Sequence, residues 1–168
     1  MMRTTLLAAI ALALFAPTIY AQDIEALERS LEKARMDAPM TLKPFMAVTR
    51  PAKYYGDYEA RGNTQYGRGE KLHFYAEPKN LVYPRNAAGV YEPAFDVDFE
   101  VRPPQGETLK QEKFMSMRLP TRSRVQDIYL NLTISLGSAP PGKYNIKFTV
   151  RDANSKKVAS VDQDVTLK

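Results

Sequence analysis

The strongest constraint on the fold is the alternation of apolar and polar residues at the end of the chain. Two runs, Tyr144–Arg151 and Val158–Leu167, alternate with a period of two, and a polar turn at residues 154–155 separates them. A period of two places successive side chains on opposite faces of a strand. The two runs therefore predict an antiparallel β-hairpin with one apolar face.

The register of this hairpin follows from the position of its turn. A turn at residues 154–155 pairs Lys147 with Asp162 and Phe148 with Val161. This pairing places the two opposite charges on the exposed face and the two apolar side chains on the inner face. The same register therefore satisfies both the charge pairing and the apolar core. The register is a prediction that a structure can test.

Earlier segments alternate in the same way. In Phe95–Arg102 the apolar residues point to one side, and Asp96, Asp98 and Glu100 point to the other, where we expect Lys or Arg on the neighbouring strand. The other predicted strands are Leu42–Val48, at an edge, Glu70–Glu77, Thr108–Met117 and Ile128–Leu136. About seven strands with one apolar face each predict an all-β fold, an immunoglobulin-like antiparallel β-sandwich.

The first 21 residues have the three regions of a secretory signal peptide. Arg3 supplies a positive charge, Leu6–Ala16 is apolar, and Ala21 is a small residue before the expected cleavage at Gln22. The apolar run is too short to span a membrane, which takes roughly 20 residues. We therefore expect an exported protein, periplasmic or extracellular, with no transmembrane segment in the mature chain.

The segment between the signal peptide and the sandwich combines a helix with a proline-containing linker, residues 22–53. Gln22–Asp37 has a narrow apolar stripe at helical spacing, which predicts a short amphipathic helix. The stripe consists of Ile24, Leu27, Leu31 and Ala34. A helix of this length is marginal in water by itself, so it either packs on the sandwich, residues 54–168, or docks onto a partner.

The chain contains no cysteine, which excludes disulfides, thiol chemistry and cysteine metal sites. His73 is the only histidine, and it lies in the middle of a predicted strand rather than on a loop, where catalytic groups are more often placed. Carboxylates two apart on one strand are about 7 Å apart, too far to chelate one calcium ion without help. We expect no catalytic residues, no metal site and no cofactor.

Two segments are candidate binding sites. The first is a loop at residues 53–71 that interleaves lysine and arginine with Tyr54, Tyr55, Tyr58 and Tyr66. Exposed tyrosines offer flat faces to a protein or to sugar rings, but the same composition fits a loop that folds back onto the sandwich.

The second candidate is the basic loop at residues 118–124, which contains Arg118, Arg122 and Arg124. These arginines could contact phosphate or carboxylate groups of an envelope polymer, and a solvated loop is the alternative. Nucleic acid is not an expected ligand, because the chain is predicted to be exported.

Residues 54–167 resemble a loose group of exported bacterial proteins with an immunoglobulin-like domain. The shared features are turn and core residues, namely Gly69-Glu70-Lys71-Leu72-His73-Phe74-Tyr75-Ala76-Glu77, Pro141-Gly142-Lys143-Tyr144 and Asp152. The resemblance implies the sandwich fold and implies no catalytic residues. The sequence thus favours a non-enzymatic binding or adaptor domain for a protein partner in the bacterial envelope, with a module for polysaccharide or anionic envelope polymer as the alternative.

Overall fold

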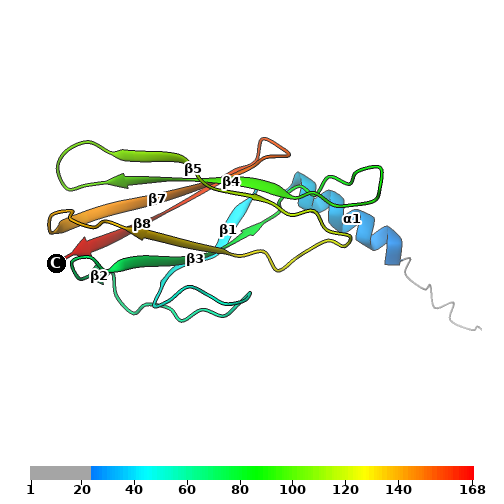
Figure 1. Ribbon diagram of the computed structural model, residues 1–168. Helices are drawn as coiled ribbons and strands as arrows, with labels where there is room; N and C mark the ends of the chain where they lie inside the picture. The colour runs from blue at the N-terminus through cyan, green and yellow to red at the C-terminus, as the bar shows by residue number, and fades with distance from the viewer. Residues whose placement is uncertain (1–23) are drawn as a thin grey trace, which may run out of the picture.

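The computed structural model describes residues 24–168, so the predicted signal peptide, residues 1–21, lies outside the described residues. In this part of the chain one helix precedes eight strands, which form two packed sheets (Figure 1). The three-stranded sheet has the order β1-β3-β6, and the five-stranded sheet has the order β2-β8-β7-β4-β5. The elements are α1 (Ile24–Asp37), β1 (Thr41–Val48), β2 (Gln65–Tyr66), β3 (Lys71–Lys79), β4 (Ala94–Arg102), β5 (Leu109–Arg118), β6 (Leu130–Ser135), β7 (Gly142–Asp152) and β8 (Val158–Leu167).

The predicted fold, a β-sandwich preceded by a helix, is confirmed. The expected edge strand at Leu42–Val48 is β1, so the sandwich includes residues that precede Tyr54. The structure has eight strands, rather than about seven, because it contains one strand that was not predicted, β2, which has two residues. β2 pairs in parallel with the end of β8 and is too short to show an alternating pattern.

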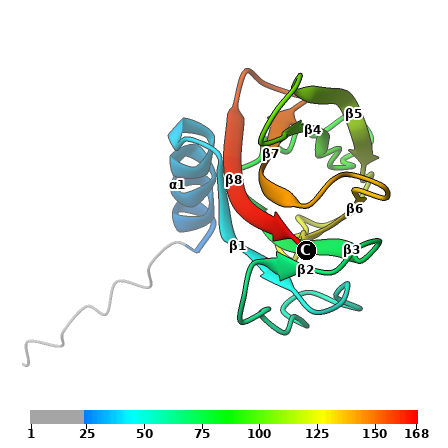
Figure 2. The same ribbon diagram turned by 90° about the vertical axis from the view of Figure 1, so that its left-hand side faces the viewer.

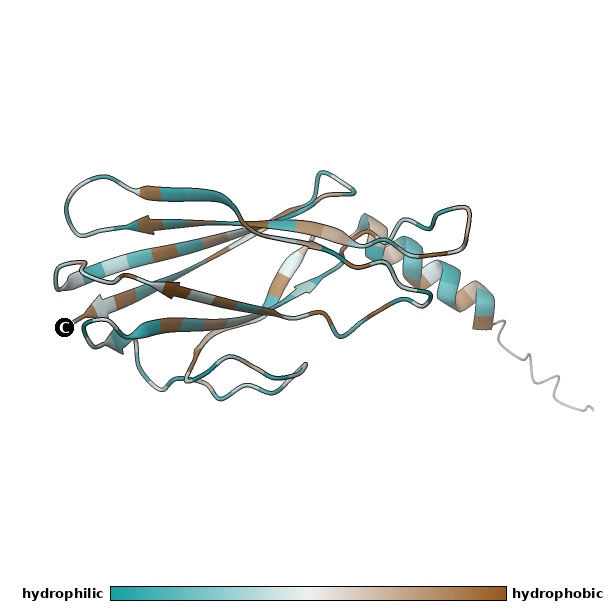
Figure 3. Cartoon of the chain, viewed as in Figure 1, coloured by the Kyte–Doolittle hydropathy of each residue, from teal (hydrophilic) through white to brown (hydrophobic). Residues whose placement is uncertain are grey.

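The register of the last hairpin is also confirmed. Lys147 lies opposite Asp162 and Phe148 lies opposite Val161 in the β7–β8 pair. Figure 3 shows the alternation along β7, where hydrophilic and hydrophobic residues follow one another. The inner face of this strand is buried, and the outer face is partly exposed.

The core between the sheets contains a cluster of aromatic rings. The ring of Phe74 on β3 lies 5.3 Å from that of Phe148 on β7 and 5.8 Å from that of Phe45 on β1, measured between centroids. Phe148 joins the two sheets, because its ring contacts both Phe74 and Phe45, and β3 and β1 belong to one sheet and β7 to the other.

The acidic residues of β4 face cations from other strands, as expected. Asp96 pairs with Arg118 of β5 at 3.2 Å, and Asp98 pairs with Arg151 of β7. Asp98 is nevertheless buried. The β4–β5 pairing is irregular at this point, and the backbone N–H of Lys113 on β5 donates to the Asp98 carboxylate at 2.8 Å. This irregularity supplies the hydrogen bond that makes the burial of this charge tolerable.

The outer face of β3 differs from the expectation of one apolar face per strand. Leu72, Phe74 and Ala76 alternate toward the main core, so Tyr75 points to the opposite face, yet it is fully buried. The loop after β1 folds over this face, and the rings of Tyr58 and Tyr129 lie 4.6 Å and 5.8 Å from that of Tyr75. The loop thus forms a small second core with Val48 and Ala52 on the outside of the three-stranded sheet.

Helix α1 extends beyond one end of the two sheets (Figure 1), and the view along the strands shows it displaced to the side on which β1 and β8 lie (Figure 2). None of its residues is buried. Within residues 24–168 the structure contains no helix with the length and apolar content required to cross a membrane.

Candidate functional site

Tyr66 lies in the sandwich core and not on an exposed loop. Its side chain is fully buried, and the guanidinium of Arg61 covers its ring at 4.2 Å from the centroid. Burial raises the pKa of the Tyr66 hydroxyl, which has no hydrogen-bond partner among the described residues. The expectation that Tyr66 presents its ring to a ligand is therefore corrected, because β2 carries it inward.

Tyr55 and Tyr58 fold back onto the sandwich. The hydroxyl of Tyr55 donates to the carboxylate of Glu77 at 2.5 Å and accepts from the ammonium of Lys79 at 2.7 Å. One face of the Tyr58 ring is covered by Tyr75. Tyr54 is the loop tyrosine with the most open ring, at 65% exposure. Of the two alternatives for this loop, the structural role accounts for most of its tyrosines.

The three arginines of the basic loop point to different places. Arg118 is held by the carboxylate of Asp96 and the backbone carbonyl of Met117, at 3.2 Å and 2.8 Å. Arg122 is exposed to solvent. Arg124 pairs with Glu32 of α1, so it alone reaches the helix. The loop therefore presents no continuous basic track.

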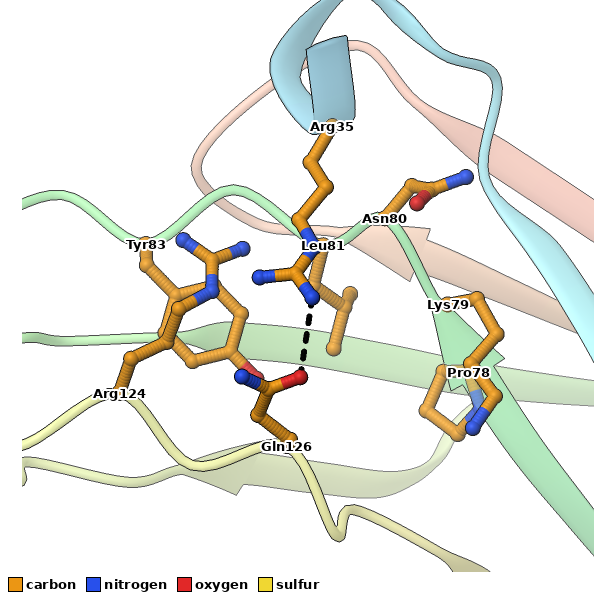
Figure 4. Close-up of a pocket in the computed structure, with 8 residues that line it drawn as sticks. All are labelled: Arg35, Pro78, Lys79, Asn80, Leu81, Tyr83, Arg124 and Gln126. Carbon is orange, nitrogen blue, oxygen red and sulfur yellow. Dashed lines mark hydrogen bonds between the residues drawn. The ribbon is translucent and has the colours of Figure 1, made fainter. Parts of the chain in front are cut away.

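A pocket of about 340 Å³ lies where α1 meets the sandwich (Figure 4). Three cationic side chains line it, Arg35 from the helix, Lys79 from the end of β3 and Arg124 from the loop before β6. The remaining lining residues are Pro78, Asn80, Leu81, Tyr83 and Gln126. None of the eight lining residues is acidic.

Hydrogen bonds hold the helix at this junction. The guanidinium of Arg35 donates to the side-chain oxygen of Gln126 at 2.9 Å. The backbone carbonyl of Arg35 accepts from the ammonium of Lys157 at 2.8 Å, and the same ammonium donates to the carbonyl of Asn80 at 3.0 Å. Polar contacts of the last two turns thus attach α1 to the sandwich.

Two of the three cations in the pocket are already neutralised. Arg124 pairs with Glu32 and lies 4.1 Å above the ring of Tyr83, and Lys79 pairs with Glu77 at 2.6 Å. Burial would lower the pKa of Lys79, but its hydrogen bonds with Glu77 and Tyr55 raise it above the usual value, so the ammonium stays charged.

Arg35 differs from the other two cations in the pocket. Among the described residues it forms no ion pair, and its side-chain acceptor is the neutral amide of Gln126. The side chain is half-buried. Its positive charge is therefore available to a ligand.

The apolar stripe of α1 is open to solvent. Leu27 and Leu31 are each 49% exposed, and Ile24 and Met36 are also exposed. Residues four apart lie next to one another on a helix, so Leu27, Leu31 and Arg35 follow one another along one side. Of the two alternatives for the helix, packing on the sandwich does not account for this stripe.

Sequence reasoning missed the pocket because its three cations lie far apart in the chain, in the helix, at the end of β3 and in the loop before β6. The only signal was the position of Arg35, one turn after Leu31 on the predicted helix. Lys79 also connects the pocket to the tyrosine-rich loop, through its hydrogen bond with Tyr55.

No protein-family model matches this sequence, and no curated protein does. Solved structures that are distantly similar in architecture include Spo0M and SoxY. Spo0M, a sporulation control protein from Bacillus subtilis, aligns with 78% of this chain at 8% identity and a TM-score of 0.38, and the match spans 50% of Spo0M. The sulfur carrier protein SoxY from Chlorobium limicola f thiosulfatophilum aligns with 86% of this chain and 98% of its own, at 8% identity and a TM-score of 0.34. No functional conclusion rests on either likeness.

Proposed function

We propose that this protein is an exported, non-enzymatic binding domain that engages a protein partner through helix α1. The observation that carries the proposal is that none of the 14 residues of α1 is buried, although the helix has an apolar stripe. A helix of this length gains most of its stability from the burial of such a stripe. A partner that covers the stripe would complete that burial.

The energy available from this burial fits a specific contact. Full burial of a leucine side chain contributes about 1.5–3 kcal/mol, and Leu27 and Leu31 are about half exposed. Covering both side chains therefore contributes about 2 kcal/mol before the cost of association. Further contacts, beyond those of the two leucines, are needed for a stable complex.

The arrangement of the arginines supports a protein partner over an envelope polymer. A polymer with repeating charges is bound best by a row of cations, but Arg118 is held by Asp96 and Arg124 by Glu32. Arg122 and Tyr54 remain exposed. The polymer stays the second candidate, and the test below distinguishes it.

The test is site-specific photo-crosslinking in the native cell envelope. We place a photoreactive amino acid at Leu27 in one strain and at Leu109 in another. Leu109 is the matched control, since it is an exposed leucine on β5, at 67% exposure, and lies outside the helix. We expect one discrete protein adduct from position 27 and none from position 109.

Salt and substitution complete the test. An apolar contact survives about 0.5 M salt, whereas binding to an anionic polymer is screened at that concentration. Leu27→Ser with Leu31→Ser is expected to abolish the adduct, measured with the photoreactive group at Ile24. Equal adducts from positions 27 and 109, or salt-labile glycan as the only ligand, would contradict the proposal.

A further inference from the structure

We propose that the pocket at the base of α1 is a carboxylate-binding site, which receives an aspartate or glutamate side chain of the partner. The inference rests on the proposed function for the source of the carboxylate. The geometry of the pocket itself supports the chemical class of the ligand. Figure 4 shows the guanidinium groups of Arg35 and Arg124 directed into the same space.

The first step concerns charge. Arg35, Lys79 and Arg124 line the pocket, and none of its lining residues is acidic. Arg124 is neutralised by Glu32 and Lys79 by Glu77, and neither glutamate lines the pocket. One positive charge, that of Arg35, remains without an acidic partner among the described residues. A single anionic group would neutralise it.

The second step concerns hydrogen bonding. A guanidinium has five N–H donors, and a carboxylate accepts two of them in a parallel pair. The side chain of Arg35 uses one N–H for Gln126, at 2.9 Å. Donors therefore remain for a ligand. The amide nitrogen of Gln126 supplies a further donor beside the guanidinium.

The third step concerns the walls of the pocket. Leu81 and Pro78 are buried, and the ring of Tyr83 is half-buried under Arg124. Apolar walls lower the local dielectric constant, which strengthens an ion pair relative to one on the open surface. They also offer contacts to the methylene groups of an acidic side chain. The cavity, about 340 Å³, holds such a side chain and not only an ion, since one water molecule occupies about 30 Å³.

The fourth step distinguishes carboxylate from phosphate. A phosphate group carries nearly two negative charges at neutral pH. Only one cation in the pocket is uncompensated, because Glu32 and Glu77 are paired with the other two. A second negative charge would be repelled by these glutamates, so the pocket favours a monoanion.

The pocket also continues the apolar stripe of the helix. Leu31 precedes Arg35 by one turn, so a partner that covers the stripe reaches the pocket with the next part of its surface. The partner therefore presents an apolar surface followed by an acidic side chain. This order of groups is the recognition pattern that we assign to the junction.

The ligand class can be tested without the partner. We titrate the mature protein with sodium propionate and follow the side-chain N–H signals of Arg35 and Gln126 by NMR. Propionamide, a neutral molecule of the same shape, and methyl phosphate are the comparison probes. We expect saturable shifts with propionate, none with propionamide, and weaker binding of methyl phosphate. The absence of saturable shifts with propionate, or tighter binding of methyl phosphate, would overturn the assignment.

Three variants place the shifts at the pocket. Arg35→Gln removes the charge, and we expect the dissociation constant for propionate to rise at least about tenfold. Gln126→Glu places a carboxylate beside Arg35 within the protein itself, so it competes with propionate while it keeps the helix attached. Arg122→Gln, which changes an exposed arginine of the same loop, is expected to alter the constant less than about twofold.

The variant Gln126→Glu keeps the inference testable if Arg35→Gln detaches the helix. Its melting temperature is expected to equal or exceed that of the wild type, with propionate binding lost. Unchanged propionate binding in Gln126→Glu would reject the pocket as the site. If propionate fails to bind but Leu27 still crosslinks one protein, the carboxylate site is wrong and the proposed function stands. If propionate binds but position 27 crosslinks no protein, the proposed function is wrong and the carboxylate site stands.

Discussion

The hydroxyl of Tyr75 donates a hydrogen bond of 2.9 Å to the buried carboxylate of Glu77, two residues later on the same strand. Glu77 also accepts from Tyr55 and Lys79. The backbone N–H of Gly56 in turn donates to the Tyr75 hydroxyl at 2.9 Å. One carboxylate thus connects the loop after β1 to the outer face of the three-stranded sheet and to the pocket beside α1.

Glu77→Gln is expected to destabilise the protein by about 1–3 kcal/mol at pH 7, because an amide accepts fewer hydrogen bonds and leaves a donor unpaired in a buried site. Burial opposes ionisation of Glu77, but hydrogen bonds from Lys79, Tyr55 and Tyr75 outweigh it and hold its pKa below 4.5. A lowered pKa in the folded state gives stability that is present above pH 4.5 and is lost as the pH falls through the folded value.

The measurement is the free energy of unfolding in urea at pH 7 and below pH 4.5. The difference between wild type and Glu77→Gln should shrink as the pH falls through the lowered pKa. The difference between the two proteins is measured because Glu70 and Asp96 also have lowered pKa values, and their contribution is the same in both proteins. Glu107→Gln, at an exposed turn residue, is the control and should change neither value. A pH-independent difference for Glu77→Gln would contradict the prediction.

Removal of residues 24–37 is expected to lower the Tm by less than about 4 °C. The helix contributes no buried residue, and its attachment consists of hydrogen bonds and an ion pair that are partly solvated. Such contacts typically contribute about 0–1 kcal/mol. Thermal unfolding followed by circular dichroism measures the effect.

Phe148→Ala provides the scale for that measurement. The ring packs against Phe74 and Phe45 between the two sheets, and its removal is expected to cost about 3–5 kcal/mol. If deletion of the helix lowers the Tm as much as Phe148→Ala, then α1 is a structural part of the sandwich and not a docking element.

Much of the fold is readable from the sequence because strands with one buried face leave a pattern of period two. The register of β7 and β8 follows from that pattern and from one polar turn. The conspicuous motif residues also prove to be structural. Glu70 accepts from the backbone N–H of Gly67 at 2.8 Å, and Asp152 accepts from that of Asn154 at 2.8 Å.

The rest of the structure depends on contacts between distant segments, which one sequence does not display. Tyr66 lies in a strand of two residues, and Tyr75 is covered by the loop after β1. Neither element has an alternating pattern that a sequence could reveal. The pocket is hidden for the same reason, because Arg35, Lys79 and Arg124 meet only after the sandwich has formed. The apolar stripe of α1 was predicted, but the sequence left open whether it packs on the sandwich or docks onto a partner.

Asp57→Asn is expected to loosen the loop after β1 without lowering the Tm. The carboxylate accepts two hydrogen bonds from Arg50, at 2.9 Å and 2.7 Å, and one from the backbone N–H of Lys53 at 2.9 Å. The hydrogen bond from Arg50, with that from Lys53, holds the pKa of Asp57 well below its usual range. The acceptor is therefore charged at neutral pH, and the amide that replaces it is weaker.

Hydrogen exchange measures this loosening locally. The amides of Lys53 and Gly56 should exchange faster in Asp57→Asn, because local opening requires less free energy when their loop is less restrained. Asp127→Asn, at an exposed residue of the loop before β6, is the control. Unchanged exchange at both amides would show that the carboxylate of Asp57 does not restrain the loop, which Tyr55, Tyr75 and Asn131 also hold by hydrogen bonds.

Gly142→Ala is expected to destabilise the protein by about 1–3 kcal/mol, because a Cβ atom at this position would lie 2.8 Å from Cγ of Pro104. Pro104 belongs to the turn between β4 and β5, so the substitution pushes that turn away from the start of β7. Gly62→Ala is the matched control, since a Cβ there meets no atom within 4 Å. The unfolding midpoint in urea measures both changes.

Combining Gly142→Ala with Pro104→Ala tests the cause of this destabilisation. Removal of the proline ring relieves the contact, so the double variant should be more stable than the sum of the two single effects indicates, by at least about 0.5 kcal/mol. Additive effects would show that the backbone conformation of Gly142, and not its approach to Pro104, requires glycine. In either case the Pro141-Gly142-Lys143-Tyr144 motif marks the corner that joins β6 to β7, which explains its occurrence in a fold of this kind without reference to a ligand.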